Sequence, residues 1–143
     1  MNPGGNLRYF PVINPAAIVD DAAFTTATID TQGAYRVQIL VHIGATDIAA
    51  AVFKVQESDA SNMGSATDIS GTDLASTVTA GVDNTIIVYD INLAGNRKRY
   101  LDLSFTAGNG SLGTYASAVA ILWMKNSPTS NTERNVTAYT AIN

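Results

Sequence analysis

The sequence contains no cysteine and a single histidine, His42, among its 143 residues. Without thiols the chain has no disulfide, no thiolate metal site and no cysteine nucleophile, which excludes a disulfide-stapled secreted module. His42 lies in an alternating apolar stretch with no acidic cluster at metal-ligand spacing, so it is interpreted as an ordinary strand residue. The sequence also lacks a nucleophile elbow, a phosphate-binding glycine loop and zinc-ligand spacing. We therefore expect a protein that is not an enzyme and that uses no cofactor and no metal.

Charged residues are also scarce, at 14% of the chain, against roughly 25% in ordinary domains. The net charge is −4, and the one basic cluster is Arg97-Lys98-Arg99. Nucleic-acid binding requires many phosphate contacts, which an acidic chain with one basic triplet does not supply. The apolar run at 116–124 is much shorter than the roughly 20 residues that span a bilayer, and the first ten residues do not resemble a signal peptide. We expect neither nucleic acid nor membrane as a partner.

The clearest structural pattern extends from Tyr35 to Glu57. Apolar residues occupy every odd position from Tyr35 to Ile43, and Leu40 is the one apolar residue at the alternate positions. A period of two residues is typical of a strand with one buried face. Gly44-Ala45-Thr46-Asp47 favours a turn, and residues 48–57 alternate again. The pattern predicts a central β-hairpin.

Further alternating segments predict strands at 24–30, 85–93, 99–106 and 114–124, with possible short strands at 17–20 and 74–78. Residues 85–106 are expected to form a second hairpin, in which Asp90 and Asp102 are ordinary polar-face residues. The strand at 114–124 is the most apolar and is predicted to be central, with Tyr115 and Trp123 on the core side. The side chains predicted to be mostly buried are Val37, Ile39, Val41, Phe53, Leu101, Leu103, Ile121 and Trp123. Seven or eight short strands without a helical period predict an all-β fold, an antiparallel β-sandwich of jelly-roll type.

The sandwich is expected to cover residues 17–125, between an extended N-terminal arm (1–16) and an extended C-terminal tail (126–143). Prolines in the arm confine any strand there to a sheet edge, yet the arm is apolar and is expected to dock. Two alternatives stay open: the arm lies along its own domain, or it lies on a neighbouring subunit. The basic triplet is interpreted as a second contact, through its arginines. The candidate partner-contact residues are Leu7, Tyr9, Phe10, Val12, Arg97 and Arg99.

Three stretches, AAFTTATIDTQG, VQILVHIGATDIAAAVFKVQESD and DINLAGNRKRYLDLSFTAG, resemble a family of small proteins encoded by tailed bacteriophages, prophages and cyanobacterial viruses, often near the head genes. The likeness covers about residues 18–125, and its most specific pieces are GATDIA, KVQESD and RKRYLDL. The resemblance implies a virion structural protein made in the host cytoplasm. Small β-sandwich proteins of this size often serve as capsid decoration (cement) proteins, so the resemblance further implies a decoration protein. Such a protein binds and stabilises the major capsid protein as a homo-oligomer, most often a trimer. Two alternatives are a carbohydrate-binding β-sandwich and a head-fibre or tail component.

Overall fold

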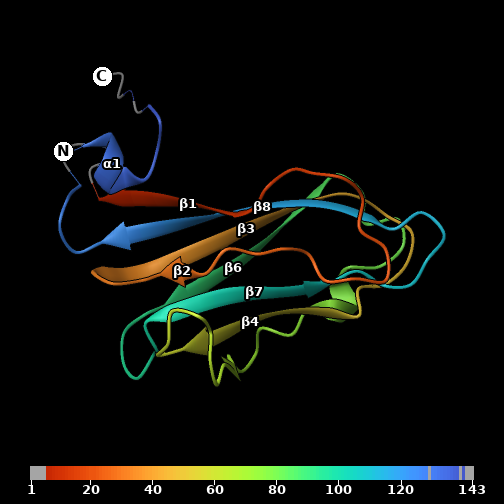
Figure 1. The fold of residues 1–143 in the computed structure, drawn as a ribbon, viewed down its shortest axis with the longest axis horizontal. Coiled ribbons are helices and arrows are strands. Elements are labelled where there is room, and N and C mark those ends of the chain that lie inside the picture. The colour runs from red at the N-terminus through yellow and green to blue at the C-terminus, as the bar shows by residue number, and fades with distance from the viewer. Residues whose placement is uncertain (1–5, 129, 139, 141–143) are drawn as a thin grey trace.

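In the computed structural model, which describes residues 6–128, 130–138 and 140, the chain forms two four-stranded antiparallel sheets (Figure 1). Sheet A has the order β1-β8-β3-β6, and sheet B has the order β2-β7-β4-β5. The strands of sheet A are β1 (Leu7–Ile13), β8 (Thr114–Met124), β3 (Ala34–Thr46) and β6 (Thr85–Asn92). Those of sheet B are β2 (Ile29–Asp30), β7 (Tyr100–Thr106), β4 (Val52–Ser58) and β5 (Thr67–Asp68).

The strand order is that of a jelly roll. The first strand pairs with the last, β1 with β8, and the nested pairs β2–β7, β3–β6 and β4–β5 follow inward along the chain. Two further pairings, β3–β8 and β4–β7, join these pairs into the two sheets. The predicted all-β antiparallel sandwich is therefore confirmed.

Neither of the two predicted hairpins forms, so both predictions are wrong. β3 pairs with β6 and β8 in sheet A, whereas β4 pairs with β5 and β7 in sheet B. The connection at 47–51 therefore crosses between the sheets, and the connection at 93–99 does the same between β6 and β7. Alternation shows which face of a strand is buried but not which strand lies beside it. As a consequence Asp90 and Asp102 lie on opposite sheets rather than side by side.

The core lies between the sheets and is centred on stacked aromatic rings. The ring of Phe105 lies 4.5 Å from that of Phe24 and 4.7 Å from that of Phe53, between ring centroids. The Phe53 ring is 5.3 Å from that of Tyr89, whose hydroxyl donates to the Phe53 carbonyl oxygen at 3.0 Å. Six of the eight predicted core residues are fully buried: Val37, Ile39, Val41, Phe53, Leu101 and Leu103.

The predicted core face of β8 is wrong. Ala118, Ala120 and Leu122 face the core, while Ile121 and Trp123 are half-buried on the outer side and Tyr115 is exposed. β8 is apolar on both faces, so alternation cannot select the inner one, and the prediction placed the larger side chains inside. In the structure the aromatic rings come from other segments, and the small alanines of β8 leave room for them.

The remaining segments differ from expectation in detail. Only β2 is strand within 24–30, residues 17–20 contribute one bridge from Val19 to Thr114, and 74–78 contains a 3₁₀ turn (Ala75–Thr77) rather than a strand. The expected C-terminal tail contains one turn of helix, α1 (Asn131–Arg134), which begins with a capping box formed by Ser130 and Glu133. No helix in the described residues is long and apolar enough to cross a membrane.

Candidate interaction surface

Residues 7–13 of the N-terminal arm form β1, an edge strand of sheet A, so this part lies along its own domain. The pairing runs from Leu7 opposite Trp123 to Ile13 opposite Ala118. A register shift between Pro11 and Ile13 accompanies the burial of both Val12 and Ile13. Apolar side chains that a free arm would expose are thus covered within the same chain.

The candidate contact residues on β1 consequently divide into two groups. Val12 is buried and Phe10 packs against the core. Leu7 and Tyr9 are half-buried and share the outer face with Trp123 and Ile121, their partners in register. Only Leu7 and Tyr9 remain available at the outer surface of sheet A.

The two arginines of the basic triplet form ion pairs with acidic residues of sheet B and its loops. Arg97 lies 3.2 Å from a carboxylate oxygen of Glu57. Arg99 donates two hydrogen bonds of 2.8 Å to the Asp30 carboxylate, and this interaction lowers the pKa of Asp30. The triplet is therefore not a free cationic cluster, and the pairing reduces the electrostatic contribution expected from it. Leu7 and Tyr9 lie on the outer face of sheet A, whereas Arg97 and Arg99 pair with Glu57 of β4 and Asp30 of β2 in sheet B.

The outer face of sheet A carries an apolar row that sequence reasoning missed. Pro11, Val119, Leu40 and Val88 lie in register across all four strands of the sheet. Val119 and Val88 flank Leu40 and are 44% and 46% exposed. Neighbouring positions continue the patch, with Tyr9 and Ile121 on one side and Ile86, which is 62% exposed, on the other. We call Pro11, Val119, Leu40 and Val88 the apolar row.

A neutralised polar cluster borders the apolar row. Arg36 donates from Nε to Asp90 Oδ1 at 2.7 Å, and Gln38 donates to Asp90 Oδ2 at 3.0 Å. The Arg36 guanidinium lies 5.3 Å from the centre of the Trp123 ring. The hydrogen bonds from Arg36, and next from Gln38, lower the pKa of Asp90 to about 2. The border therefore adds no unpaired charge to the face, which suits an apolar partner better than an ionic one.

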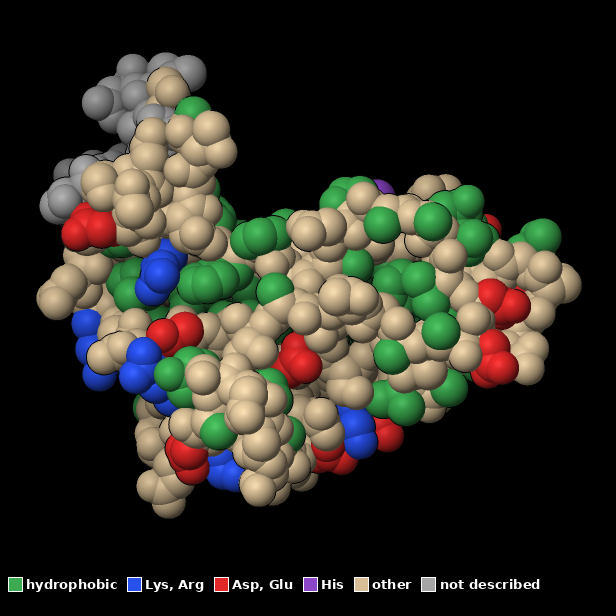
Figure 2. All heavy atoms as spheres, viewed as in Figure 1, with side chains coloured by type: hydrophobic (Ala, Val, Ile, Leu, Met, Phe, Trp, Pro, Cys, Tyr) green, Lys and Arg blue, Asp and Glu red, His purple; other side chains and the backbone are tan. Residues whose placement is uncertain are grey.

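The outer face of sheet B is different. Lys54 donates to Asp68 at 2.7 Å, Gln56 donates to the same carboxylate at 2.7 Å, and Lys98 reaches Thr67 at 3.2 Å. Figure 2 shows basic and acidic side chains interspersed over β4 and β7, in the lower half of the view. One outer face of the sandwich thus carries interspersed charges, and the other carries the apolar row beside one neutralised polar cluster.

The loops at one end of the sandwich are tied together by aspartates. The Asp47 carboxylate accepts hydrogen bonds of 2.6 Å from the backbone N–H groups of Ser111 and Leu112, which lower its pKa. Asp20 accepts another from the Gly110 N–H at 3.0 Å. In the described part of the chain, no group of three or more His, Asp or Glu residues is placed to hold a metal ion. The aspartates order the loops by capping backbone N–H groups.

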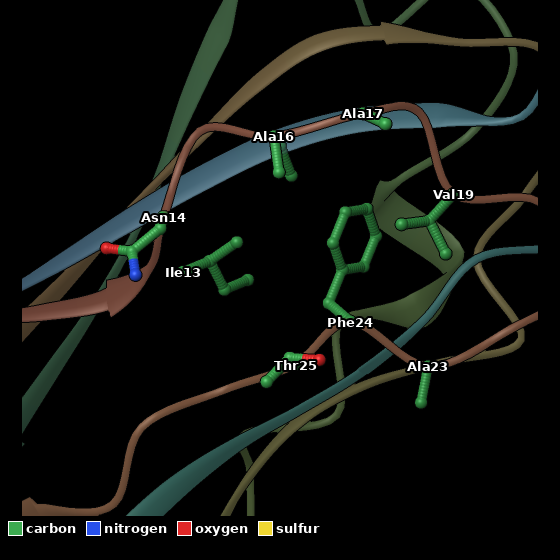
Figure 3. Close-up of a pocket in the computed structure, with 9 residues that line it drawn as sticks. Ile13, Asn14, Ala16, Ala17, Val19, Ala23, Phe24 and Thr25 are labelled. Atoms are coloured by element: carbon green, nitrogen blue, oxygen red, sulfur yellow. The ribbon is translucent and has the colours of Figure 1, made fainter.

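Two small hollows lie near the connection between β1 and β2. The first, of about 220 Å³, is lined mainly by apolar side chains, among which Ile13, Val19 and Phe24 converge in Figure 3. The second, of about 150 Å³, lies on the outer face of sheet A between His42, Tyr115 and Ser117. Both are smaller than the roughly 300–1,000 Å³ of typical small-molecule sites.

No protein-family model matches the chain, and no curated protein is similar to it in sequence. Jelly rolls carry many unrelated functions. The outer face of sheet A is therefore the feature from which a role is best argued.

Proposed function

We propose that this protein is a non-catalytic structural protein of a tailed-phage virion, a capsid decoration protein that binds and stabilises the shell of major capsid protein. The observation that carries the proposal is the apolar row on the outer face of sheet A. The resemblance of three stretches to phage proteins encoded near head genes supports the same role. In this proposal the protein resides on the capsid surface as a homo-oligomer, for which the resemblance implies a trimer.

The energetics favour a covered sheet face. The largest apolar patch on an ordinary monomer is about 300–600 Å² and is often functional. At about 25 cal/mol per Å², covering such a patch is worth about 7–15 kcal/mol before the cost of association is subtracted. The cost of association is of similar size, about 4–15 kcal/mol, so the net gain from the face of one copy is small.

The proposal also assigns an orientation. Sheet A would face the shell, with Val119 and Leu40 near the centre of the contact, and the charged face of sheet B would face the solvent. Arg97 and Arg99, already paired within the chain, would contribute little to attachment. The contact would be mainly apolar and so only weakly dependent on salt.

The test uses capsids of the phage that encodes the chain, prepared without this protein, and purified protein added back. We expect the wild-type protein to bind, and Val119→Lys to bind at least about tenfold more weakly because a lysine would be desolvated in the contact. The matched control is Ser104→Lys, at a half-buried position on the outer face of sheet B. Equal binding by the Val119 variant and the wild type would overturn the assigned face, and absence of the protein from purified virions would overturn the capsid role.

A carbohydrate-binding module is the second candidate, and one observation favours it. Tyr115 is 46% exposed and lines the smaller hollow beside His42 and Ser117, and an aromatic ring with nearby polar groups can contact a sugar. Binding on a glycan array that is lost in Tyr115→Ala would favour this function. Mass spectrometry of separated heads and tails would distinguish the decoration role from a head-fibre or tail component.

A further inference from the structure

Three of the four sheet edges are protected in the described part of the chain. β2 and β5 are only two residues long. β1 contains Pro11 and a register shift. In addition, the carbonyl oxygens of Tyr9 and Val12 accept hydrogen bonds from the Asn135 side chain, at 2.8 Å, and from the Ala27 N–H, at 2.9 Å. Short strands, prolines, bulges and covering segments are the usual means of preventing edge-to-edge pairing.

β6 is the remaining edge strand, and its backbone is open to pairing. The Leu93 N–H donates to the Tyr35 carbonyl oxygen at 3.0 Å, which is a hydrogen-bonded pair in the register of β3 and β6. Such pairs alternate along an antiparallel ladder, so the odd residues of β6 bond to β3. The N–H and C=O groups of the even residues therefore point to the free edge: Ile86, Val88, Asp90 and Asn92.

The side chains of β6 also lack features that discourage pairing. The strand is eight residues long and contains no proline, glycine, lysine or arginine. Ile86 and Val88 are exposed on the outer face. The one charged residue, Asp90, is paired with Arg36. A long edge with exposed apolar side chains and no unpaired charge is suited to accept another strand.

We propose that β6 pairs with β6 of a second copy of this chain, antiparallel across a two-fold axis, so that two A sheets become one eight-stranded sheet. The remaining edges are protected, so pairing of β6 with a different edge is disfavoured and the contact closes as a dimer. This two-fold contact differs from the trimer that the resemblance implies. The inference does not rest on the capsid role, because every residue that carries it lies in β6 or beside it.

The sequence of β6 selects a register. Pairing Asp90 with Asp90 of the second copy would place like charges opposite each other, which is destabilising. Pairing Val88 with Asp90 would place a carboxylate against the valine of each apolar row. Pairing Val88 with Val88 separates the two Asp90 carboxylates and joins the two apolar rows through their valines. In this register residues 85–91 of the two strands overlap, and each Asp90 lies opposite Ile86 of the second copy. We assign this register to the dimer.

The experiment is sedimentation of the purified full-length chain, without capsids, at concentrations up to about 1 mM. We expect a dimer for the wild type and at least about a tenfold rise in Kd for Val88→Lys, which sets two lysines opposite each other. The control is Val119→Lys, which stays dimeric. Val119 matches Val88 in residue type, in exposure and in its position opposite Leu40 in the apolar row, but it belongs to the interior strand β8.

A crosslink tests the register. The chain has no native cysteine, so Val88→Cys introduces one thiol per copy. Hydrogen-bonded antiparallel pairs have a Cα–Cα separation of about 5.5 Å, within the range that a disulfide spans. Mild oxidation should therefore convert Val88→Cys, but not Val119→Cys, into a covalent dimer. A monomeric or trimeric wild type, an unchanged Kd for Val88→Lys, or no crosslink at position 88 would overturn the proposal, and none of these results depends on capsid binding.

Discussion

Truncation of β1 tests whether residues 1–13 form a strand of the fold or a detachable arm. If residues 1–13 were an arm lying on a neighbouring subunit, their deletion would leave a stable folded domain. In the structure Val12 and Ile13 are 2% and 4% exposed and belong to the core. Deletion removes both side chains from the core and leaves the β8 edge unpaired.

The expected loss can be worked out from these two residues. Burial of a valine or isoleucine side chain is worth about 1.5–3 kcal/mol, so the pair contributes about 3–6 kcal/mol. A domain of this size has a free energy of unfolding of about 5–15 kcal/mol. The truncated chain should therefore have a free energy of unfolding about 3–6 kcal/mol lower than that of the full chain, a large fraction of the total. A gentler change, Ile13→Ala, should cost about 2–3 kcal/mol, the lower part of the range for such substitutions, because Ile13 already borders a hollow of about 220 Å³.

The assay is guanidinium unfolding followed by tryptophan fluorescence and far-UV circular dichroism. Trp123 is the single tryptophan and lies opposite Leu7 in the β1–β8 register, so its emission reports on β1 directly. Leu7→Ala is the matched control. Leu7 is half-buried on the outer face, and its truncation should cost less than about 1 kcal/mol.

One result would refute this reasoning. If deletion of residues 1–13 changes the free energy of unfolding by less than about 0.5 kcal/mol, β1 is dispensable to the domain. The segment would then be free to lie on a partner, as the second of the two alternatives drawn from the sequence holds.

Three further predictions concern charge and backbone. The pKa of Asp90 is about 2, below its ordinary value of 3.8. A pKa that is lowered in the folded state stabilises the fold at pH values above the ordinary pKa, and this stabilisation is lost as the pH falls from about 4 to 2. Asp90→Asn should therefore flatten the fall in denaturation midpoint over that window, and an unchanged slope would contradict the ion pair. Arg97→Ala with Arg99→Ala should cost no more than about 1 kcal/mol at the exposed Arg99–Asp30 pair and more at the Arg97–Glu57 pair, because the Glu57 side chain is only 12% exposed. Capsid binding should be unchanged, and loss of binding would show that the triplet contributes to the interface. Gly113→Ala should lower the free energy of unfolding by more than about 2 kcal/mol, because φ is +82° and a Cβ would lie 2.6 Å from a carbonyl oxygen. An unchanged free energy of unfolding would refute that geometry.

The buried faces of most strands were predictable from the sequence, but the strand partners were not. Val37, Ile39 and Val41 alternate with polar residues, and burial followed that pattern. The hairpins failed because the turn residues at 44–47 do not show whether the chain returns to the same sheet or crosses to the other. In β8 the pattern was uninformative, since Trp123 and Leu122 are equally plausible core residues until the positions of the core aromatic rings are known.

The candidate surface was even less accessible to sequence reasoning. The apolar row combines Pro11, Leu40, Val88 and Val119, which come from four strands distant in the chain. Each is unremarkable alone, and the jelly-roll order brings them together. Leu40, the single apolar residue on an otherwise polar strand face, was the one visible sign of a partner for that face.

The proposed dimer forms through the β6 edge and the proposed capsid contact through the outer face of sheet A, so the two would reinforce each other. In an antiparallel pair across a two-fold axis normal to the sheet, the outer faces of both copies point the same way. The two apolar rows would then form one surface, joined at Val88. Binding of one copy to a shell would hold the other near its own site, so the second contact would form at a high effective concentration. A patch too small to hold one copy firmly could therefore hold a dimer, provided that the spacing of sites on the shell matches the joined sheet.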